Sequence, residues 1–567
     1  MGFWGTGSAA RRPSLALVLP AAVGIVCAAV VLGTVLLVSS GPRIANTDHT
    51  HADPRVSVKS PVLRNPELSI SSSRPPNIVV LLADDMAFLP HWEEQPPVVS
   101  MAHINTLAAD PRSKHVVKSL PHSDRIRREG VVFEDAYTAA PRCMTSRLAT
   151  LTGRVPSKAV AARRISRGGM GEKFGIDPNW RALIENYWVG MEGIDAEENL
   201  PTFLQALGYR TGHVGKWHLQ PNKTDKWENY TAAVETVQDN GFDFAGGVYE
   251  HNMPELSKDA TFSHNLEWLA AEARTFILEA VRDEEPFFLY FATSTPHGPS
   301  NRQAMTQFSV RDTPAGVLDR DPDSDMPSRK EILSRHGVTS RNCGYYWTDE
   351  AFGAIYRQLE RLGQLDNTIL VWAVDHGQNT KNSLFQGGVR TPMAIRYPPM
   401  APPGTRSSKL VSLMDLLPTF VYASGQATAL SFDFPMDGTS IFPLESPGHK
   451  VQYLEVDVSR SLVTSKYKYI EFDSDHWRTG KRSSKIMPRM HPDYLERRQL
   501  YNLLDDPDES VNLITDRWKK LGLTTEPEEF RAAMSCIDER LMLDIPDSEA
   551  RRSSLQPCFS LLSPELL

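Results

Sequence analysis

The sequence predicts an α/β fold with a mostly parallel central sheet flanked by helices, followed by a smaller α+β domain containing an antiparallel sheet. Three short, continuous apolar runs have the composition of buried parallel strands: "NIVVLLADD" from Asn77, "FFLYFATSTPHGP" from Phe287 and "TILVWAVDHG" from Thr368. Stretches of helical period lie between them, over residues 264–283 and 348–365. Strands that alternate with helices are typical of a parallel sheet covered on both faces.

The character of the chain changes on either side of this region. Residues 44–75 are rich in Ser, Pro, Arg and Asn without an apolar period, so we interpret them as a stalk or linker. After about residue 425, the runs "VQYLEVDV", "SLVTSKYKYIEFD" and "QLYNLLDDPDESVNL" indicate strands and turns with few helices. The sequence therefore predicts a main domain over residues 76–425 and a smaller C-terminal domain over residues 426–567.

The N-terminus contains an uncharged apolar segment from Pro13 to Pro42. A membrane-spanning helix needs about 20 apolar residues, whereas the apolar region of a signal peptide has about 7–15. Arg11 and Arg12 precede the segment and favour a cytoplasmic N-terminus. We therefore expect a cytoplasmic tail and signal anchor over residues 1–43, and a single-pass membrane protein in the secretory pathway whose remaining chain is luminal or extracellular. Cleavage of the segment as a signal peptide, which gives a secreted protein, is the alternative.

Other bulk features bear on compartment and partners. N-glycosylation triplets begin at Asn222 and Asn229, in what reads as a polar loop. Of the five cysteines, Cys536 and Cys558 lie near the C-terminus and are able to pair, which the sequence leaves open. The net charge of −8 gives no reason to expect nucleic acid as a partner, because phosphate binding requires clustered Lys and Arg.

Polar side chains stand at the ends of all three predicted strands. The first strand ends in Asp84 and Asp85, the second leads to His297, and the third ends in Asp375 and His376. Open parallel sheets bind ligands just beyond the carboxyl ends of their strands. Two strand ends that carry acids, with a third that carries a histidine, indicate one functional site at this edge.

Two further motifs carry chemistry of their own. In "LGYRTGHVGKWHL", Lys216 and His218 are two residues apart, and on an extended segment they face the same side. An ammonium beside an imidazole suits an anionic substrate that needs a proton-transfer group. In "APRCMTSRLATLTGR", Cys143 precedes Arg147, so it is a core thiol, a thiolate nucleophile favoured by the positive charge, or the precursor of another group.

Taken together, these motifs resemble the sulfatase family of the alkaline-phosphatase-like superfamily. The resemblance covers residues 76–513 and rests on six elements in family order: "PNIVVLLADD", "GVVFEDAYTAAPRCMTSRLATLTGR", "LGYRTGHVGKWHL", "PFFLYFATSTPHGP", "DNTILVWAVDHG…KNSLFQGGVRTP" and "LYNLLDDPDESVNL". It implies an alkaline-phosphatase-like sheet for the main domain, which would then be the catalytic domain.

The resemblance also implies a modified nucleophile. In the family, the formylglycine-generating enzyme converts the motif cysteine to formylglycine in the secretory pathway, and Cys143 holds that position. One hydroxyl of the hydrated aldehyde attacks sulfur and expels the alcohol, and ionisation of the second hydroxyl then eliminates sulfate. A plain Ser or Cys sulfate ester would need water for its hydrolysis, whereas a diol supplies an internal route.

Further roles follow from the resemblance, position by position. A divalent cation, expected to be Ca²⁺ because the site is rich in carboxylates, would bind Asp84, Asp85, Asp375, His376 and the oxygen of modified Cys143. Arg147 would orient the diol, and His218 would act on it. Lys216 and Lys381 would bind sulfate oxygens, while His297 and Lys381 would protonate the leaving oxygen.

The chain departs from the family pattern at three positions. Thr145 stands where the modification signal normally has Pro or Ala, which bears on the efficiency of conversion. His376 stands where many relatives have Asn, and its imidazole is a softer ligand than an amide oxygen. Gln386 stands where Glu is usual, and we find no physical reason for this change to abolish activity.

Two charged segments are interpreted separately. The basic run over residues 157–169, with Lys158, Arg163, Arg164 and Arg167, is either a binding surface for an anionic polysaccharide or a solvated insertion. The acidic run over residues 319–331 lacks the spacing of a calcium loop and is expected to be a surface loop.

The sequence therefore predicts a sulfuric ester hydrolase that releases inorganic sulfate and an alcohol or phenol, with a sulfated glycan as one candidate substrate. One alternative keeps the fold and changes the substrate to a phosphate or phosphonate ester. The other is an inactive relative that binds sulfated glycans, in which Cys143 is not modified.

Overall fold

A computed structural model describes residues 74–87, 117, 119–158, 194–219, 229–253, 256–336, 342–426, 436–456, 459–471, 491, 493–494, 496–514, 528–541, 555–564 and 566–567. All of them belong to one compact unit, residues 70–567. The predicted N-terminal anchor, Asn222, Arg163, Arg164 and Arg167 lie outside the described residues. Within the described part of the chain, no helix is both long and apolar enough to cross a membrane.

The central sheet has eight strands in the order β10-β2-β9-β8-β1-β5-β3-β4. Their bounds are Asn77–Asp84 (β1), Val131–Tyr137 (β2), Arg210–Lys216 (β3), Phe244–Tyr249 (β4), Phe287–Pro296 (β5), Thr368–Val374 (β8), Met393–Arg396 (β9) and Thr405–Ser412 (β10). Strand β9 is antiparallel to both neighbours, and all other pairings are parallel. The prediction of a mostly parallel sheet is confirmed.

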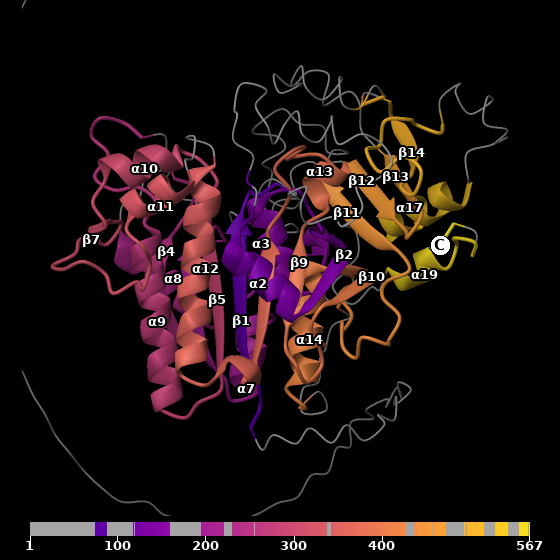
Figure 1. The fold of residues 1–567 in the computed structure, drawn as a ribbon. Helices are drawn as coiled ribbons and strands as arrows, with labels where there is room; N and C mark the ends of the chain where they lie inside the picture. The colour runs from indigo at the N-terminus through magenta and orange to yellow at the C-terminus, as the bar shows by residue number, and fades with distance from the viewer. Residues whose placement is uncertain are drawn as a thin grey trace, which may run out of the picture. The chain divides into compact units, whose positions relative to one another are not determined.

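Helices cover both faces of this sheet because its inner strands are apolar on both sides. Val79 and Leu81 of β1 pack in one core with helices α2 (Pro121–Glu129), α9 (Leu266–Arg282) and α12 (Cys343–Arg361). Ile78 and Val80 face the opposite core with α3 (Cys143–Thr152), α7 (Leu200–Ala206), α8 (Tyr230–Gln238) and α14 (Leu416–Ala423). Figure 1 shows α9 and α12 on one side of β1 and α14 on the other.

The remaining elements of the main region are short. They are α10 (Asn301–Gln307), α11 (Arg329–His336), α13 (Gln386–Val389), the pair β6 (Asp312–Thr313) and β7 (Gly316–Val317), and the 3-10 turns Pro156–Lys158, Leu365–Asn367 and Leu413–Asp415. The acidic run is a surface loop as predicted, because Asp319, Asp321 and Asp323 are exposed and helix α11 begins only at Arg329.

A second sheet follows, as the C-terminal sequence predicts. Strands β11 (Gln452–Val456), β12 (Ser459–Val463), β13 (Tyr467–Glu471) and β14 (Arg498–Asn502) form an antiparallel sheet in chain order. Helices α17 (Glu528–Leu541) and α19 (Gln556–Phe559) pack near it and are joined by the Cys536–Cys558 disulfide, so the pairing left open by the sequence is formed. The domain boundary near residue 425 remains a prediction.

Two local features add detail to the expectations. Asn229 is exposed and lies outside helix and strand, directly before α8: it is the N-cap of that helix, and its side chain accepts from the N–H groups of Thr231 and Ala232. An Asn immediately before a helical run satisfies these otherwise unpaired donors. The segment predicted to be helical over residues 348–365 begins earlier, at Cys343, because the preceding turn of α12 is also buried.

Candidate active site

The carboxyl ends of β1 and β8 bring two acidic residues to one edge of the sheet. Asp84 is the last residue of β1 and Asp375 directly follows β8, and both side chains are buried. The Asp375 N–H donates to Ala83 O at 3.0 Å, which extends the pairing of the strands up to the site. Asp375 Oδ1 accepts from the backbone N–H groups of Asp85 and His376 at 3.0 and 2.9 Å, and this holds both turns in place.

Four side chains of metal-ligand type converge at this edge. One ligand atom from each lies within 4.8 Å of the others, and the four residues are Asp84, Cys143, Asp375 and His376, all buried. Asp85 lies beside this group, with its Oδ1 3.7 Å from His376 Nδ1. The structure thus brings the five predicted metal ligands to one place, four of them in a single tight group.

Cys143 is the first residue of α3, which begins shortly after β2 ends. Its Sγ lies 3.5 Å from Asp84 Oδ1, 3.2 Å from His376 Nε2 and 3.7 Å from Lys381 Nζ. One turn further along α3, Ser146 Oγ donates to the Asp375 carbonyl at 2.5 Å and ties the helix to the end of β8. The thiol therefore faces charged groups rather than the apolar core.

Arg147 lies on the same face of α3 as Cys143, since residues four apart are neighbours on a helix. Its Nη2 and Nε donate to Asp375 Oδ2 at 3.1 and 3.3 Å, and Nη2 is 3.8 Å from Asp84 Oδ2. Its Nη1 donates to the Lys216 carbonyl at 2.7 Å. The fully buried guanidinium thus joins α3 to the ends of three strands.

Two lysines surround the same group. Lys216 ends β3, is fully buried, and donates from Nζ to Asp84 Oδ2. Lys381 lies in the segment after β8, and its Nζ donates to Asp85 Oδ2 at 3.2 Å. The structure brings both predicted sulfate-binding cations to the acidic group around Cys143.

The two predicted catalytic histidines have different settings. His218 has a φ of 59°, and its N–H donates to Glu250 O, so the chain turns after β3. The prediction of an extended backbone is therefore wrong at His218, but Lys216 and His218 both reach the site beside Cys143. His297 Nδ1 lies 2.8 Å from Gly298 O, and its Nε2 is 3.9 Å from Asp85 Oδ2. This ring is partly exposed, which suits contact with a substrate.

The charges at the site shift the acidity of its members in opposite directions. Burial and Asp84 oppose ionisation of the Cys143 thiol, but Lys216, Lys381 and His376 outweigh them and hold its pKa well below the usual value. Burial likewise opposes ionisation of Asp84, yet Lys216 and the other nearby cations hold its pKa well below the usual value. The charges at the site therefore favour the anionic form of both groups.

Other members are driven toward their protonated or neutral forms. Burial and the neighbouring Asp84 carboxylate raise the pKa of Asp375 to about 6. Burial opposes the charge of His376, but Asp375 and Cys143 raise its pKa to about 9. Burial and Lys216 lower the pKa of His218 to about 4, so this imidazole is neutral and able to accept a proton.

These residues fit a divalent cation. Asp84 and Asp375 are buried carboxylates close enough to disfavour double ionisation, and a cation between them would reverse that effect. Asp85 Oδ1 is buried and has no hydrogen-bond partner among the described residues. Such oxygen atoms suit a hard cation, while the His376 imidazole adds one softer ligand.

A family model described as Sulfatase matches residues 76–425. The chain belongs to the sulfatase family. It is therefore an enzyme of the sulfuric ester hydrolase class.

Curated relatives and a solved structure agree with this membership. The sulfatase is 27% identical to the uncharacterized sulfatase YdeN of Escherichia coli K12 over 66% of each protein. It is 26% identical to arylsulfatase A of Bos taurus, over 78% of this chain and 84% of that protein. It is 27% identical to N-acetylgalactosamine-6-sulfatase of Rattus norvegicus, over 71% of this chain and 72% of that protein. The structure of Ps i-CgsB with k-i-k-neocarrahexaose shares the fold at a TM-score of 0.53 and 20% identity, covering 86% of this chain and 97% of that one.

The sequence reasoning missed one polar residue at the site of this sulfatase. Asn252 lies three residues after β4, and its Oδ1 accepts from Lys216 Nζ at 2.5 Å. The exposed Asn252 side chain thus contacts the buried Lys216 ammonium from the solvent side. A single exposed Asn three residues beyond a strand carries no sequence signal comparable with the acids that end β1 and β8.

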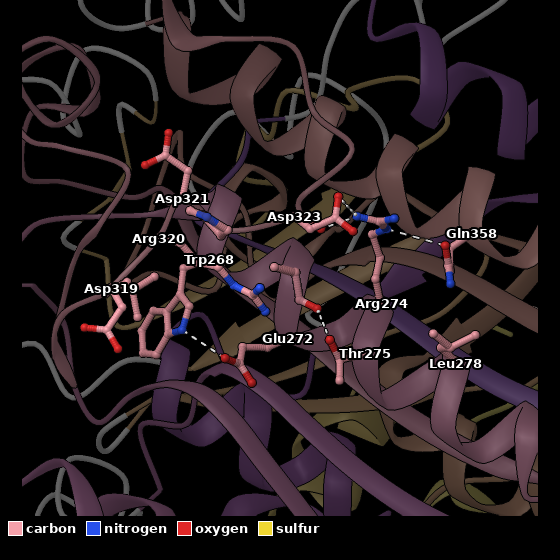
Figure 2. Close-up of a pocket in the computed structure, with 13 residues that line it drawn as sticks. Trp268, Glu272, Arg274, Thr275, Leu278, Asp319, Arg320, Asp321, Asp323 and Gln358 are labelled. Carbon is pink, nitrogen blue, oxygen red and sulfur yellow. Dashed lines mark hydrogen bonds and ion pairs between the residues drawn. The ribbon is translucent and has the colours of Figure 1, made fainter.

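A separate pocket of about 390 Å³ lies between α9 and the segment 318–323 of the sulfatase (Figure 2). Figure 2 shows Arg274 between Asp323 and Gln358, with contacts of 3.1 and 3.4 Å. Its lining contains none of the predicted site residues. The enzyme's candidate active site is the group around Cys143, at the edge of the sheet.

Proposed function

We propose that this sulfatase hydrolyses sulfate esters with a formylglycine made from Cys143 and a bound divalent cation, and that the cation is Ca²⁺. The products are inorganic sulfate and an alcohol or phenol. The proposal rests on one observation: Cys143 Sγ lies within 3.7 Å of Asp84, His376 and Lys381, at the first turn of a helix whose Arg147 is buried on the same face. The position of Sγ marks where the oxygen atoms of the modified residue would be.

The cation would be held by Asp84, Asp85, Asp375, His376 and an oxygen of the modified residue 143. When bound, it would lower the charge repulsion between a sulfate ester and the surrounding carboxylates. Formylglycine, as its hydrate, supplies one hydroxyl that attacks sulfur and a second whose ionisation releases sulfate. A nucleophile with a single oxygen or sulfur atom would instead need water to hydrolyse its sulfate ester.

The two lysines provide the sulfate-binding charge. Lys216 and Lys381 approach the group from different elements, and each already pairs with a carboxylate. Preorganised cations cost no reorganisation when negative charge moves during the reaction. Arg147, fixed by Asp375 and the Lys216 carbonyl, orients the residue-143 hydrate and holds the strand ends in register.

The histidines divide the proton transfers. His218 is half-buried, neutral and in contact with Cys143, so it accepts the proton of a residue-143 hydroxyl. His297 is partly exposed, and its Nδ1 lies 2.8 Å from a backbone carbonyl, which leaves Nε2 toward the site. From there it donates a proton to the leaving oxygen, together with Lys381.

A sulfated glycan is the substrate class we propose. One relative, 27% identical, is named N-acetylgalactosamine-6-sulfatase, which is a sulfatase of a sugar ester. The charged groups around Cys143 would bind the sulfate group and would not distinguish one alcohol from another. The remainder of the substrate would contact the rim near Asn252 and His297.

The maturation we propose takes place in the secretory pathway, with the formylglycine-generating enzyme as partner and the N-terminal segment as membrane anchor. The Cys536–Cys558 disulfide supports an oxidising compartment. Thr145 is buried in the first turn of α3, with its hydroxyl 3.3 Å from the Arg142 carbonyl. The first helical hydrogen bond of α3 is donated by the next residue, Ser146, so the helix does not depend on a backbone donor at residue 145.

Mass spectrometry of residue 143 tests the proposal directly. Trypsin cuts after Arg142 and Arg147, and the resulting peptide of residues 143–147 carries either a thiol or an aldehyde. We expect the aldehyde in protein from a competent secretory pathway, and turnover of an aryl sulfate in preference to an aryl phosphate. Only thiol at residue 143 would contradict a formylglycine mechanism and favour the binding alternative, and a preference for aryl phosphate would contradict the sulfate assignment.

Cys143→Ala and Cys343→Ala form a matched pair for the same test. Both cysteines are buried and neither is in a disulfide. We expect Cys143→Ala to abolish turnover with nearly unchanged unfolding, because its contacts are with the charged group rather than the core. Cys343→Ala should stay active and be less stable, because it leaves a cavity in a packed core.

A further inference from the structure

The segment between His376 and Lys381 is folded against helix α13. Gly377 N–H donates to Gly388 O at 3.0 Å, and Thr380 N–H donates to Gly387 O at 3.3 Å. A Cβ atom at Gly377 would lie 2.2 Å from the Gly387 carbonyl oxygen, so the two backbones are in direct contact. The position of α13 therefore determines where this segment, and Lys381 with it, lies.

The second sheet holds α13 through a buried carboxylate. Glu509 follows β14, and its Oε2 accepts from the backbone N–H of Gln386, the first residue of α13, at 2.6 Å. Its Oε1 is 2.8 Å from Lys468 Nζ on β13, and both side chains are almost completely buried. Next to this bond, the Phe385 ring stacks on His491 at 3.6 Å, and His491 Nδ1 lies 3.1 Å from the Glu509 carbonyl.

The other end of the same segment contacts the two residues that directly precede Cys143. Asn382 N–H donates to Pro141 O at 3.2 Å, and Arg142 Nε donates to Asn382 Oδ1 at 3.1 Å. Lys381 lies between these two attachments, with its Nζ 3.7 Å from Cys143 Sγ. Displacement of α13 would thus move this ammonium relative to Cys143 without breaking the main sheet.

Stability alone is a weak reason for such a pair. Burying an ion pair costs hydration free energy, and the attraction between the two charges barely offsets that cost. Apolar replacements of similar volume are therefore often neutral or stabilising. The Glu509 carboxylate does something that an apolar side chain cannot, because it accepts the hydrogen bond that begins α13. Its effect is therefore expected in the position of the segment 377–388 more than in the free energy of unfolding.

We propose that Glu509, neutralised by Lys468, is a positioning residue for Lys381: it fixes α13 and thereby holds the Lys381 ammonium at Cys143. The inference rests on the proposed function in one respect, the role of Lys381 in turnover. The coupling between Glu509 and the segment 377–388 stands independently of that role.

Two double variants separate hydrogen bonding from charge. Lys468→Met with Glu509→Leu removes both charges and the acceptor, whereas Lys468→Met with Glu509→Gln removes the charges and keeps an amide oxygen for Gln386 N–H. We expect the Leu version to fold, to lose kcat on an aryl sulfate by about tenfold through misplacement of Lys381, and to show faster hydrogen exchange over residues 377–388. The Gln version should recover both kcat and slow exchange.

Glu267→Gln is the matched control. Glu267 is also a buried carboxylate, paired with Arg329 at 2.8 Å, but it contacts α11 and α12 rather than α13. It should lower the melting temperature without changing kcat or exchange over residues 377–388. In a Lys381→Ala background, the Leu double variant should cause no further loss of kcat, since the group it positions is gone. The fraction of modified residue 143 is measured for each variant, so that kcat refers to modified enzyme.

Several results would overturn the inference. These are unchanged exchange over residues 377–388 in a folded Leu variant, a Gln variant as impaired as the Leu variant, or fully additive losses of kcat with Lys381→Ala. Failure of the proposed function is distinct, because Lys381→Ala would then leave turnover unchanged while hydrogen exchange still reported the coupling. If the Leu variant does not fold, Lys468→Met with Glu509→Ala provides the comparison of exchange with wild type, because it also removes the acceptor for Gln386 N–H, and unchanged exchange over residues 377–388 there would again contradict the role.

Discussion

Arg147 and Asp375 form a fully buried ion pair in which the guanidinium donates to one carboxylate oxygen from Nη2 at 3.1 Å and from Nε at 3.3 Å. Removal of one member of such a pair leaves the other buried without compensation. We expect Arg147→Met to lower the free energy of unfolding by about 3–5 kcal/mol, measured by urea denaturation in the presence of a chelator. Arg335→Ala, in the exposed Arg335–Glu331 pair, should have little effect. An Arg147→Met loss no larger than that of this control would contradict the pairing.

The metal preference should depend on His376. Calcium prefers oxygen ligands, and the imidazole nitrogen is the one softer group among the predicted ligands. We expect Ca²⁺ to raise the melting temperature of the chelator-treated enzyme, because a ligand that binds only the folded state stabilises it. His376→Asn should increase the shift given by Ca²⁺ relative to that given by Zn²⁺. An unchanged ratio of the two shifts would count against His376 as a ligand, and Asp84→Asn, which should reduce the shift with either ion, is the companion variant.

His297 should matter most for substrates with poor leaving groups. A general acid contributes little when the leaving oxygen is already a weak base, and more as that basicity rises. We expect His297→Ala to reduce kcat/KM for an alkyl sulfate by about 10²–10⁴-fold and to reduce it far less for an activated aryl sulfate. The measurement is a series of sulfate esters of graded leaving-group pKa. Equal losses across the series would assign His297 to binding or structure rather than proton donation.

A pH-dependent contribution to stability comes from His449, away from the active site. Burial opposes its charge, but Asp415, whose Oδ1 is 2.7 Å from His449 Nε2, raises its pKa above the usual value. The ionised histidine therefore stabilises the fold fully below its unfolded pKa of about 6.5, and this contribution is lost as pH rises through the higher folded pKa. We expect the melting temperature to fall as the pH rises above about 6.5, and to fall more steeply in wild type than in His449→Gln.

Asp415→Asn provides the matched change on the other partner of that pair. It should reduce the slope as His449→Gln does, because either change removes the same interaction. A slope that remains in both variants would contradict this assignment and show that another group of the protein titrates in this range.

The sequence predicted much of the site because strand ends carry a readable signal. Continuous apolar runs that end in acids or histidines placed Asp84, Asp85, His297, Asp375 and His376 at one edge of the sheet, and the structure has them there. His218 was harder to predict, since the assumption of an extended chain fails where its φ is 59°. Asn252 was missed because a single exposed Asn after a strand has no periodic pattern around it.

By itself, the sequence determined the mostly parallel sheet, the helices between its strands, the antiparallel C-terminal sheet and the set of residues brought to the sheet edge. Those features follow from local apolar runs, which need no knowledge of distant neighbours. The tertiary structure alone decided the Cys536–Cys558 pairing, the turn at His218, the support of Lys216 by Asn252 and the hydrogen bond from Gln386 to Glu509. Each of these joins residues that are far apart in the chain or that depend on a backbone turn, so their distances are fixed by packing and not by local sequence.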